Sequence, residues 1–121
     1  MNLSFVAPYV DCSNALDWEI QQVAFDTVCN DADGAEESRK SPYVCISRNF
    51  EFPGTARIEW HDGKDDEGGA SIRSALLESN RILIILDKSR TIEITFALDA
   101  LHFEELKKYL CNMLSNRLNL Q

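Results

Sequence analysis

The chain has 121 residues, 45% of them hydrophobic and 26% charged, with a formal net charge of -8 and a pI near 4.6. This length and balance predict a single domain over residues 1–121 with one core. The acidic balance argues against nucleic-acid binding, which needs clustered Lys and Arg. The longest apolar run, residues 82–86, is far shorter than the roughly 20 residues that span a membrane.

Strand patterns dominate the first 60 residues. Residues 3–10 are apolar and β-favouring, with Pro8 indicating an edge or a bulge, and residues 18–28 alternate in polarity. Residues 43–48 and 57–60 predict two further strands. Residues 30–41 have a loop composition. Residues 61–69 are the most polar stretch of the chain, and we predict a loop there because nothing in them could enter a core.

The last third predicts a β-meander followed by a helix. Residues 71–77, 81–86 and 91–98 read as three antiparallel strands, with a turn at 78–80. Asp99 is a helix N-cap, after which apolar residues recur at helical spacing, and residues 116–121 are expected to fray. The fold class is therefore α+β, a single antiparallel, meander-like sheet of about six to seven strands with one C-terminal helix packed on one face. The apolar stripe of that helix consists of Phe103, Leu106, Leu110, Met113 and Leu114.

The charge is uneven along the chain. Residues 1–38 contain eight Asp or Glu and no Lys or Arg, whereas acids and bases balance at twelve each from Arg39 onward. The net charge therefore comes from the first third. One interpretation is a solvated acidic face that aids solubility, and the other is a patch that meets a basic partner.

The cysteines show no metal or redox spacing. Cys12, Cys29, Cys45 and Cys111 form no C-x-x-C pair. The first residues have neither a charged n-region nor an apolar h-region, so we expect no signal peptide and a cytoplasmic location. Free, mostly buried thiols are expected in that reducing compartment, and a disulfide from Cys12 or Cys29 to a distant partner is the alternative.

Residues suited to catalysis are few. His61 adjoins an acidic stretch that does not have calcium-loop spacing, and the run 31–34 has Cys29 and Lys40 where a calcium loop needs oxygen ligands. His102 falls in the first turn of the predicted helix, where a structural role is expected. No phosphate-binding glycine loop or nucleophile elbow occurs. A Cys-His pair stays open, but the acidic surroundings of Cys12 and Cys29 do not favour a thiolate. We therefore predict no enzyme activity, no metal and no cofactor.

Four segments, in this order and spacing, are similar to one known family. They are Tyr43-Val44-Cys45-Ile46-Ser47-Arg48-Asn49-Phe50-Glu51, Arg57-Ile58-Glu59-Trp60-His61-Asp62, Gly68-Gly69-Ala70-Ser71-Ile72, and Thr91-Ile92-Glu93-Ile94-Thr95-Phe96-Ala97-Leu98-Asp99 followed by Phe103 and Leu106. Together they resemble the Immunity protein 10 family of bacterial polymorphic-toxin and contact-dependent systems. The resemblance implies an antitoxin that binds and blocks a cognate toxin made by the same or a neighbouring cell. It carries over no catalytic residues and no fixed toxin-binding residues.

The predicted interface comes from this sequence alone. The partner-binding residues are the carboxylates of the two acidic stretches: Asp31, Asp33, Glu36, Glu37, Asp62, Asp65, Asp66 and Glu67. Trp60 is a candidate aromatic anchor beside them, although its phase with Ile58 favours core packing.

Two other classes of function stay open. One is a small-molecule or divalent-metal-binding module that uses residues 61–69. The other is an assembly subunit that pairs through an exposed strand edge at residues 3–10, so that the chain is a monomer or a weak homodimer.

Overall fold

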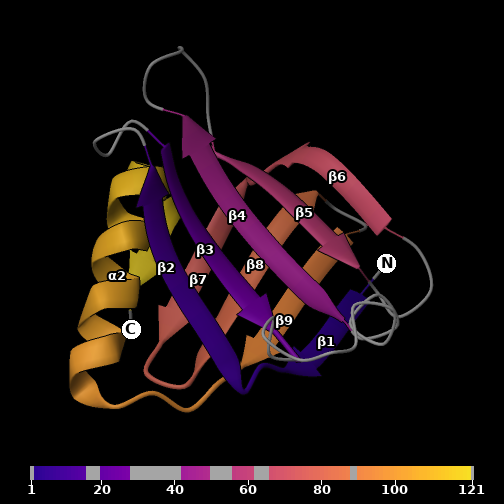
Figure 1. Ribbon diagram of the computed structural model, residues 1–121. Helices are drawn as coiled ribbons and strands as arrows, with labels where there is room; N and C mark the ends of the chain where they lie inside the picture. The colour runs from indigo at the N-terminus through magenta and orange to yellow at the C-terminus, as the bar shows by residue number, and fades with distance from the viewer. Residues whose placement is uncertain are drawn as a thin grey trace.

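The computed structural model describes residues 2–15, 20–27, 42–49, 56–61, 66–87 and 90–120. They form an α+β fold in which two five-stranded sheets face each other and a C-terminal helix lies along one side (Figure 1). Sheet A has the order β1 (Asn2–Val6), β9 (Arg90–Thr95), β8 (Arg81–Asp87), β7 (Ser74–Glu78) and β10 (Leu118–Leu120). Sheet B has the order β2 (Tyr9–Ala15), β3 (Ile20–Asp26), β4 (Tyr43–Asn49), β5 (Arg57–His61) and β6 (Asp66–Ser71).

The prediction of one antiparallel sheet is wrong, because the chain crosses between two sheets. The run 3–10 is divided between β1 and β2, and the crossing lies at Ala7 and Pro8. The Ala7 N–H donates to the Thr95 carbonyl of sheet A at 2.8 Å, and Pro8 then has no N–H with which to continue that ladder. A second crossing joins β6 to β7 through Ile72 and Arg73.

Two segments not predicted as strands also differ from expectation, since both form edge strands. Residues 66–71, within and just beyond the predicted loop, form β6 and pair with β5. Residues 118–120 do not fray but form β10, which runs parallel to β7 with Leu118 opposite Ala75. Ladder hydrogen bonds use only the backbone, and an edge strand needs few apolar side chains. The β7-β8-β9 meander is antiparallel as predicted, with β1 and β10 added parallel at its edges.

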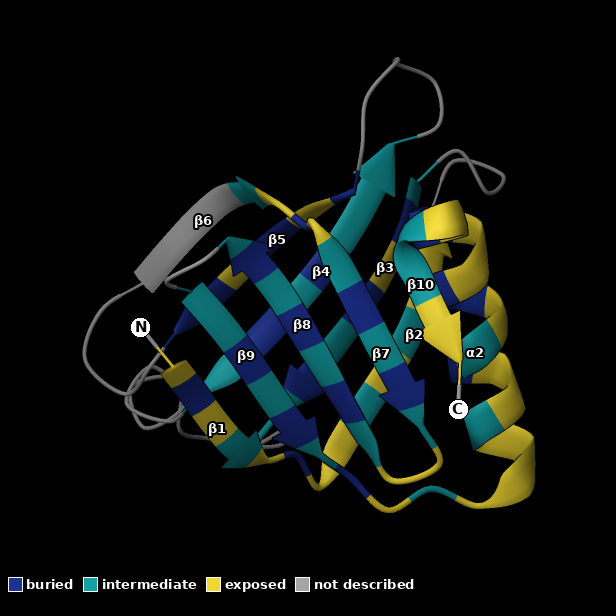
Figure 2. Cartoon of the chain, turned by 180° about the vertical axis from the view of Figure 1, so that it is seen from behind, coloured by how far each residue is buried: buried dark blue, intermediate teal, exposed yellow. Residues whose placement is uncertain are grey.

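The core lies between the two inner sheet faces. In β3, β8 and β9 every second side chain is buried, which is the pattern of strands with one face inward (Figure 2). The rings of Phe25 from sheet B and Phe96, just after β9, lie 6.0 Å apart between centroids. All the buried hydrophobic side chains in the described residues belong to one cluster.

Helix α2 (Ala100–Leu114) begins at Asp99, as predicted. The Asp99 carboxylate accepts a hydrogen bond from the His102 backbone N–H at 2.8 Å, and His102 Nδ1 lies at the same distance from the same oxygen. The helix packs against β2, β3 and β10, on the side of the sandwich where β2 forms the edge of sheet B (Figures 1 and 2). Its buried stripe contains four of the five predicted residues plus Tyr109, and Phe103 is half-buried.

The N-cap gives a pH-dependent prediction. The hydrogen bond from the His102 N–H holds the pKa of Asp99 below its ordinary value of 3.8. Because the folded-state pKa is depressed, the carboxylate stabilises the fold above the ordinary pKa, and this contribution is lost as the pH falls through the folded value. We expect Asp99→Ala to lower the melting temperature by about 3–6 °C at pH 7, with the difference shrinking below about pH 4.

Asp99→Asn is the matched control, since asparagine also caps helices but does not titrate. It should melt close to the wild type at pH 7. A wild-type-to-alanine difference that stays constant from pH 7 to pH 2 would contradict a role for the ionised carboxylate.

Candidate functional site

One cross-strand row on the outer face of sheet B organises the candidate site. Tyr9, Asp26, Tyr43, His61 and Asp66 are successive register partners across β2, β3, β4, β5 and β6. The side chains of Asp26, Tyr43 and His61 face outward, because their neighbours on β3, β4 and β5 point into the core. Those neighbours are Phe25, Val44 and Trp60, all buried.

Both predicted acidic stretches leave the sheet from this row. The chain leaves β3 after Asp26 and enters β4 at Tyr43, and it leaves β5 after His61 and enters β6 at Asp66. The Thr27 hydroxyl donates to the Pro42 carbonyl at 2.8 Å and ties the ends of the first connection together. The two connections, about 30 residues apart in the sequence, therefore start from one end of one sheet.

The structure describes only some of the predicted acidic residues. Two of them lie in β6, where the structure describes their backbone: Asp66 pairs with His61 and Glu67 with Trp60. The remaining six lie outside the described residues: Asp31, Asp33, Glu36, Glu37, Asp62 and Asp65.

Trp60 belongs to the core. Its side chain is 2% exposed, in phase with the fully buried Ile58. Of the two roles considered for Trp60, the structure therefore favours core packing over contact with a partner. The aromatic side chains available on the outer face are instead Tyr9, which is 47% exposed, and the half-buried Tyr43.

His61 sits within the sheet and not in a loop. Its ring stacks on that of Tyr43, with centroids 6.0 Å apart and planes 18° apart, and its side chain is only 4% exposed. Within the described residues, no group of three or more His, Cys, Asp or Glu is arranged to hold a metal ion. His61 thus forms part of a packed aromatic pair on the outer face of β4 and β5.

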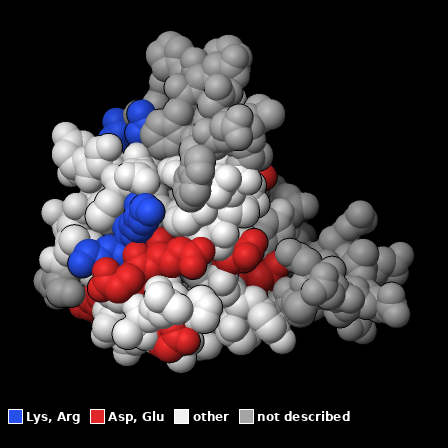
Figure 3. Space-filling model, turned by 60° about the vertical axis from the view of Figure 1, so that its left-hand side comes forward, with Lys and Arg blue, Asp and Glu red and all other residues white. Residues whose placement is uncertain are grey.

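Carboxylates outnumber bases on the outer face of sheet B. Asp11, Asp26 and Glu59 point outward from β2, β3 and β5, and among the described residues of these strands and β4 the only outward Lys or Arg is Arg57. Arg57 lies at the end away from Tyr43, where it donates to the Ser71 hydroxyl at 3.2 Å. Figure 3 brings the α2 side forward and shows acidic side chains gathered in a band there.

Part of that acidic side surrounds a cavity of about 280 Å³ between β2 and α2. Its lining includes a thiol, an imidazole and two carboxylates: Cys12, His102, Asp11 and Glu105. A cysteine and a histidine therefore line one cavity, although no contact between Cys12 and His102 is among the described interactions. In the sequence, the position of Cys12 was indicated only by its spacing: it lies two residues after Val10, so its side chain points to the same, inward side of β2.

The electrostatics of this cavity disfavour a thiolate. Burial, with Glu105 and Asp11 nearby, raises the pKa of Cys12 to about 12, so only about one such thiol in 10⁵ is ionised at pH 7. Burial, together with Glu59, raises the pKa of Cys45 to about 11. Neither thiol has the electropositive surroundings of a nucleophile.

The thiols differ from the prediction in their burial. Cys12, Cys45 and Cys111 are free, as expected, but the first two are half-buried and Cys111 is exposed. Cys29 lies outside the described residues.

The comparisons with known proteins assign no family. Neither models of known protein families nor curated protein sequences match this chain. The resemblance to the Immunity protein 10 family therefore stays a prediction. Within the described part of the chain, no helix combines the length and the apolar character needed to cross a bilayer.

Alkylation tests the protonation of the half-buried thiols. At pH 7.5 we expect iodoacetamide to modify the folded protein more slowly than the denatured one, about a thousandfold at Cys12 and about a hundredfold at Cys45, because their thiolates are scarce. Peptide mapping identifies each site, and the exposed Cys111 serves as the internal reference. Rapid modification of Cys12 in the folded protein would instead support a reactive Cys12-His102 pair.

Proposed function

We propose that this chain is an immunity protein that neutralises a cognate, basic toxin by direct contact. The chain would act without a catalytic residue or cofactor of its own. It would work in the cytoplasm of the toxin-producing cell, as a monomer or a weak homodimer. Three features support the proposal: the net charge of -8, the resemblance stated above, and the outer face of sheet B.

The common origin of the two acidic connections carries the proposal. A solvated face needs only scattered charges, whereas here the chain leaves and re-enters sheet B for both acidic connections, 28–41 and 62–65, at one end of neighbouring strand pairs. Concentrated negative charge raises the local potential and speeds the encounter with a basic partner. The hairpin stems also give these connections fixed points of attachment beside Asp26 and Tyr43.

The described residues of the row would add aromatic contacts with the partner to the attraction between opposite charges. Tyr9 is exposed on the edge strand β2. On the same face of the sheet, the ring of Tyr43 on β4 stacks on the ring of its neighbour His61 on β5. Tyrosine is enriched at binding hot spots because it offers a large, stiff apolar surface and one polar group. An exposed Tyr9 and a half-buried Tyr43 beside the ends of the acidic connections would match a partner surface with Lys or Arg around an apolar pocket.

The first experiment is co-expression with the product of the gene immediately upstream, followed by a sizing column. We expect a stable one-to-one complex, and cells that die when this chain is omitted. Absence of both a complex and toxicity would contradict the proposal. The divalent-metal alternative would instead predict a rise in melting temperature when a divalent cation is added to the isolated chain.

Charge neutralisation tests the role of the first acidic connection. We expect Asp31→Asn with Asp33→Asn to weaken the complex about tenfold at low salt, with a smaller difference at 0.5 M salt, because screening removes the same attraction. Binding kinetics should place most of this loss in the association rate.

The matched control neutralises two carboxylates on the outer face of sheet A. Glu78→Gln with Glu93→Gln makes the same change in net charge and removes only partly exposed pairs with Arg81, at 3.5 and 3.9 Å. An equal loss of affinity in both double variants would show that total charge, and not its location, determines binding.

Tyr9 provides a test on a residue that the structure places. We expect Tyr9→Ala to weaken the complex at least about tenfold while changing the melting temperature by no more than about 2 °C, since the side chain is exposed. Leu101→Ala, at an exposed position on the first turn of α2, is the control and should leave the affinity unchanged.

A further inference from the structure

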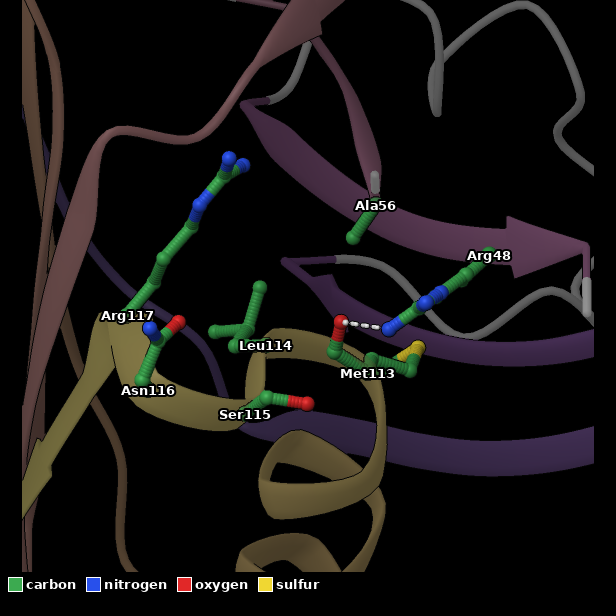
Figure 4. Close-up of a pocket in the computed structure, with 7 residues that line it drawn as sticks. All are labelled: Arg48, Ala56, Met113, Leu114, Ser115, Asn116 and Arg117. Carbon is green, nitrogen blue, oxygen red and sulfur yellow. Dashed lines mark hydrogen bonds between the residues drawn. The ribbon is translucent and has the colours of Figure 1, made fainter. Parts of the chain in front are cut away.

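A cavity whose described lining is basic lies at the other end of sheet B. It has a volume of about 190 Å³ and lies between the end of β4 and the C-terminal end of α2, where the chain enters the short 3-10 helix η1 (Ser115–Arg117). The described lining contains two arginines and no carboxylate, in a chain with a net charge of -8. The lining residues are Arg48, Ala56, Met113, Leu114, Ser115, Asn116 and Arg117 (Figure 4).

Both arginines are held in place by main-chain carbonyls. Arg48 Nη1 donates to the Met113 carbonyl at 3.1 Å, and Arg117 Nη1 donates to the Ile72 carbonyl at 3.2 Å. Figure 4 shows Arg48 reaching in from β4 and Arg117 from η1, with Leu114 between them. A guanidinium carries five N–H donors, so the bond from Arg117 to the Ile72 carbonyl orients that group and leaves donors that can face the cavity.

Helix capping explains Arg48 but not Arg117. The C-terminal end of a helix behaves like about half a negative charge, and one guanidinium on a last-turn carbonyl more than balances it. Arg117 bonds instead to Ile72, outside α2, and no ion pair joins it to a carboxylate in the described part of the chain. Its positive charge therefore remains beside the cavity.

Neutral donors stand next to this charge. Ser115 and Asn116 line the same cavity with exposed side chains, and their hydroxyl and amide can both donate hydrogen bonds. Ser115 has φ 52, the only positive φ of a non-glycine residue among those described. A serine held in that conformation, where glycine costs less, is a form of local strain that is common at binding sites.

A second cavity adjoins the first at Arg117. It has a volume of about 410 Å³, and its described lining includes Ser71, Arg73 and Asp87. The Asp87 carboxylate is bonded to Arg90 Nε at 2.7 Å, which offsets its charge. Arg117 therefore stands between two spaces, the second of which adds Arg73 and room for more than a single oxyanion.

We propose that this end of the molecule binds a phosphate group, either as inorganic phosphate or as the phosphomonoester of a small molecule. Arg117 is the main contact, since its planar fork matches two phosphate oxygens, and Ser115 and Asn116 are neutral donors on the lining of the same cavity. The rest of a phosphomonoester would lie in the cavity beside Arg73. This site does not depend on the proposed function, which uses the opposite end of sheet B.

Titration with inorganic phosphate at constant ionic strength tests the site. We expect saturable shifts of the backbone amide resonances of residues 113–118, with half-saturation in the millimolar range. Arg117→Gln should raise the concentration for half-saturation at least tenfold. Arg81→Gln removes the same charge from the far end of β8 and should behave like the wild type.

Arg117→Lys is the second variant, because Arg117 also holds the Ile72 carbonyl. Lysine keeps the charge but loses the fork, so its affinity should lie between those of the wild type and Arg117→Gln. Non-saturating shifts in the wild type, or equal shifts in the wild type and both Arg117 variants, would overturn the proposal.

Adenosine 5′-monophosphate separates the two sources of the phosphate group. Saturation at lower concentration than inorganic phosphate, with added shifts at Arg73, would identify a phosphomonoester site. Equal or weaker binding, with no shift at Arg73, would identify a site for free phosphate. Both results support a phosphate site, and loss of the response in Arg117→Gln is required in each case.

Discussion

The two sheets can bury their inner faces only if every strand keeps its alternation in register with its neighbours. In sheet B the inward rows run Val10, Phe25, Val44, Trp60 and then Cys12, Val23, Ile46, Ile58. A slip of one residue in any strand would move its apolar side chains to the outer face, at a cost of about 1.5–3 kcal/mol for each large side chain. This packing therefore also fixes what points outward, including the row from Tyr9 to His61.

The same constraint makes the ends of the sandwich the places where polar residues gather. The inward rows of sheet B end in Asn14, Gln21 and Arg48, which are register partners at the end beside α2. Asn14 Nδ2 donates to the Tyr109 hydroxyl at 3.1 Å, and Arg48 reaches the carbonyl of Met113. The helix thus closes the side of the core with polar contacts to sheet B, and the cavity beside Arg117 lies just beyond them. The acidic connections start from the other end.

The sequence predicts best those elements whose interacting residues lie close together along the chain. The β7-β8-β9 meander and the Asp99 cap were predicted because partners lie close in sequence and the periodicity is regular. The division into two sheets was missed because it depends on two short crossings, at Ala7-Pro8 and at Ile72-Arg73, that carry no sequence signal of a change of sheet. β6 and β10 were missed because their pairing is backbone-driven and their partners lie on β5 and β7. For Trp60 the phase with Ile58 predicted burial correctly.

The candidate sites show the same limit. That the two acidic stretches start from one end of sheet B follows from the register of β4 with β5, which composition does not reveal. Arg48 and Arg117 are far apart in sequence and carry no motif, so only the packing of α2 against sheet B brings them to one cavity. Sequence composition showed the sign of the charge in the first third of the chain, but not that bases collect at the opposite end.

The separation of charge has an energetic consequence for binding. Carboxylates brought close together repel each other, so two acidic connections that start from one end of sheet B would lower the stability of the isolated fold. A basic partner would relieve that repulsion when it binds. The loss of the repulsion would then add to the favourable free energy of association. The arginines at the other end are held by carbonyls of the core scaffold and would not be drawn to the acidic end. The proposed docking end and the cationic cavity would thus remain separate on one small domain, because the described arginines are fixed at the other end of sheet B.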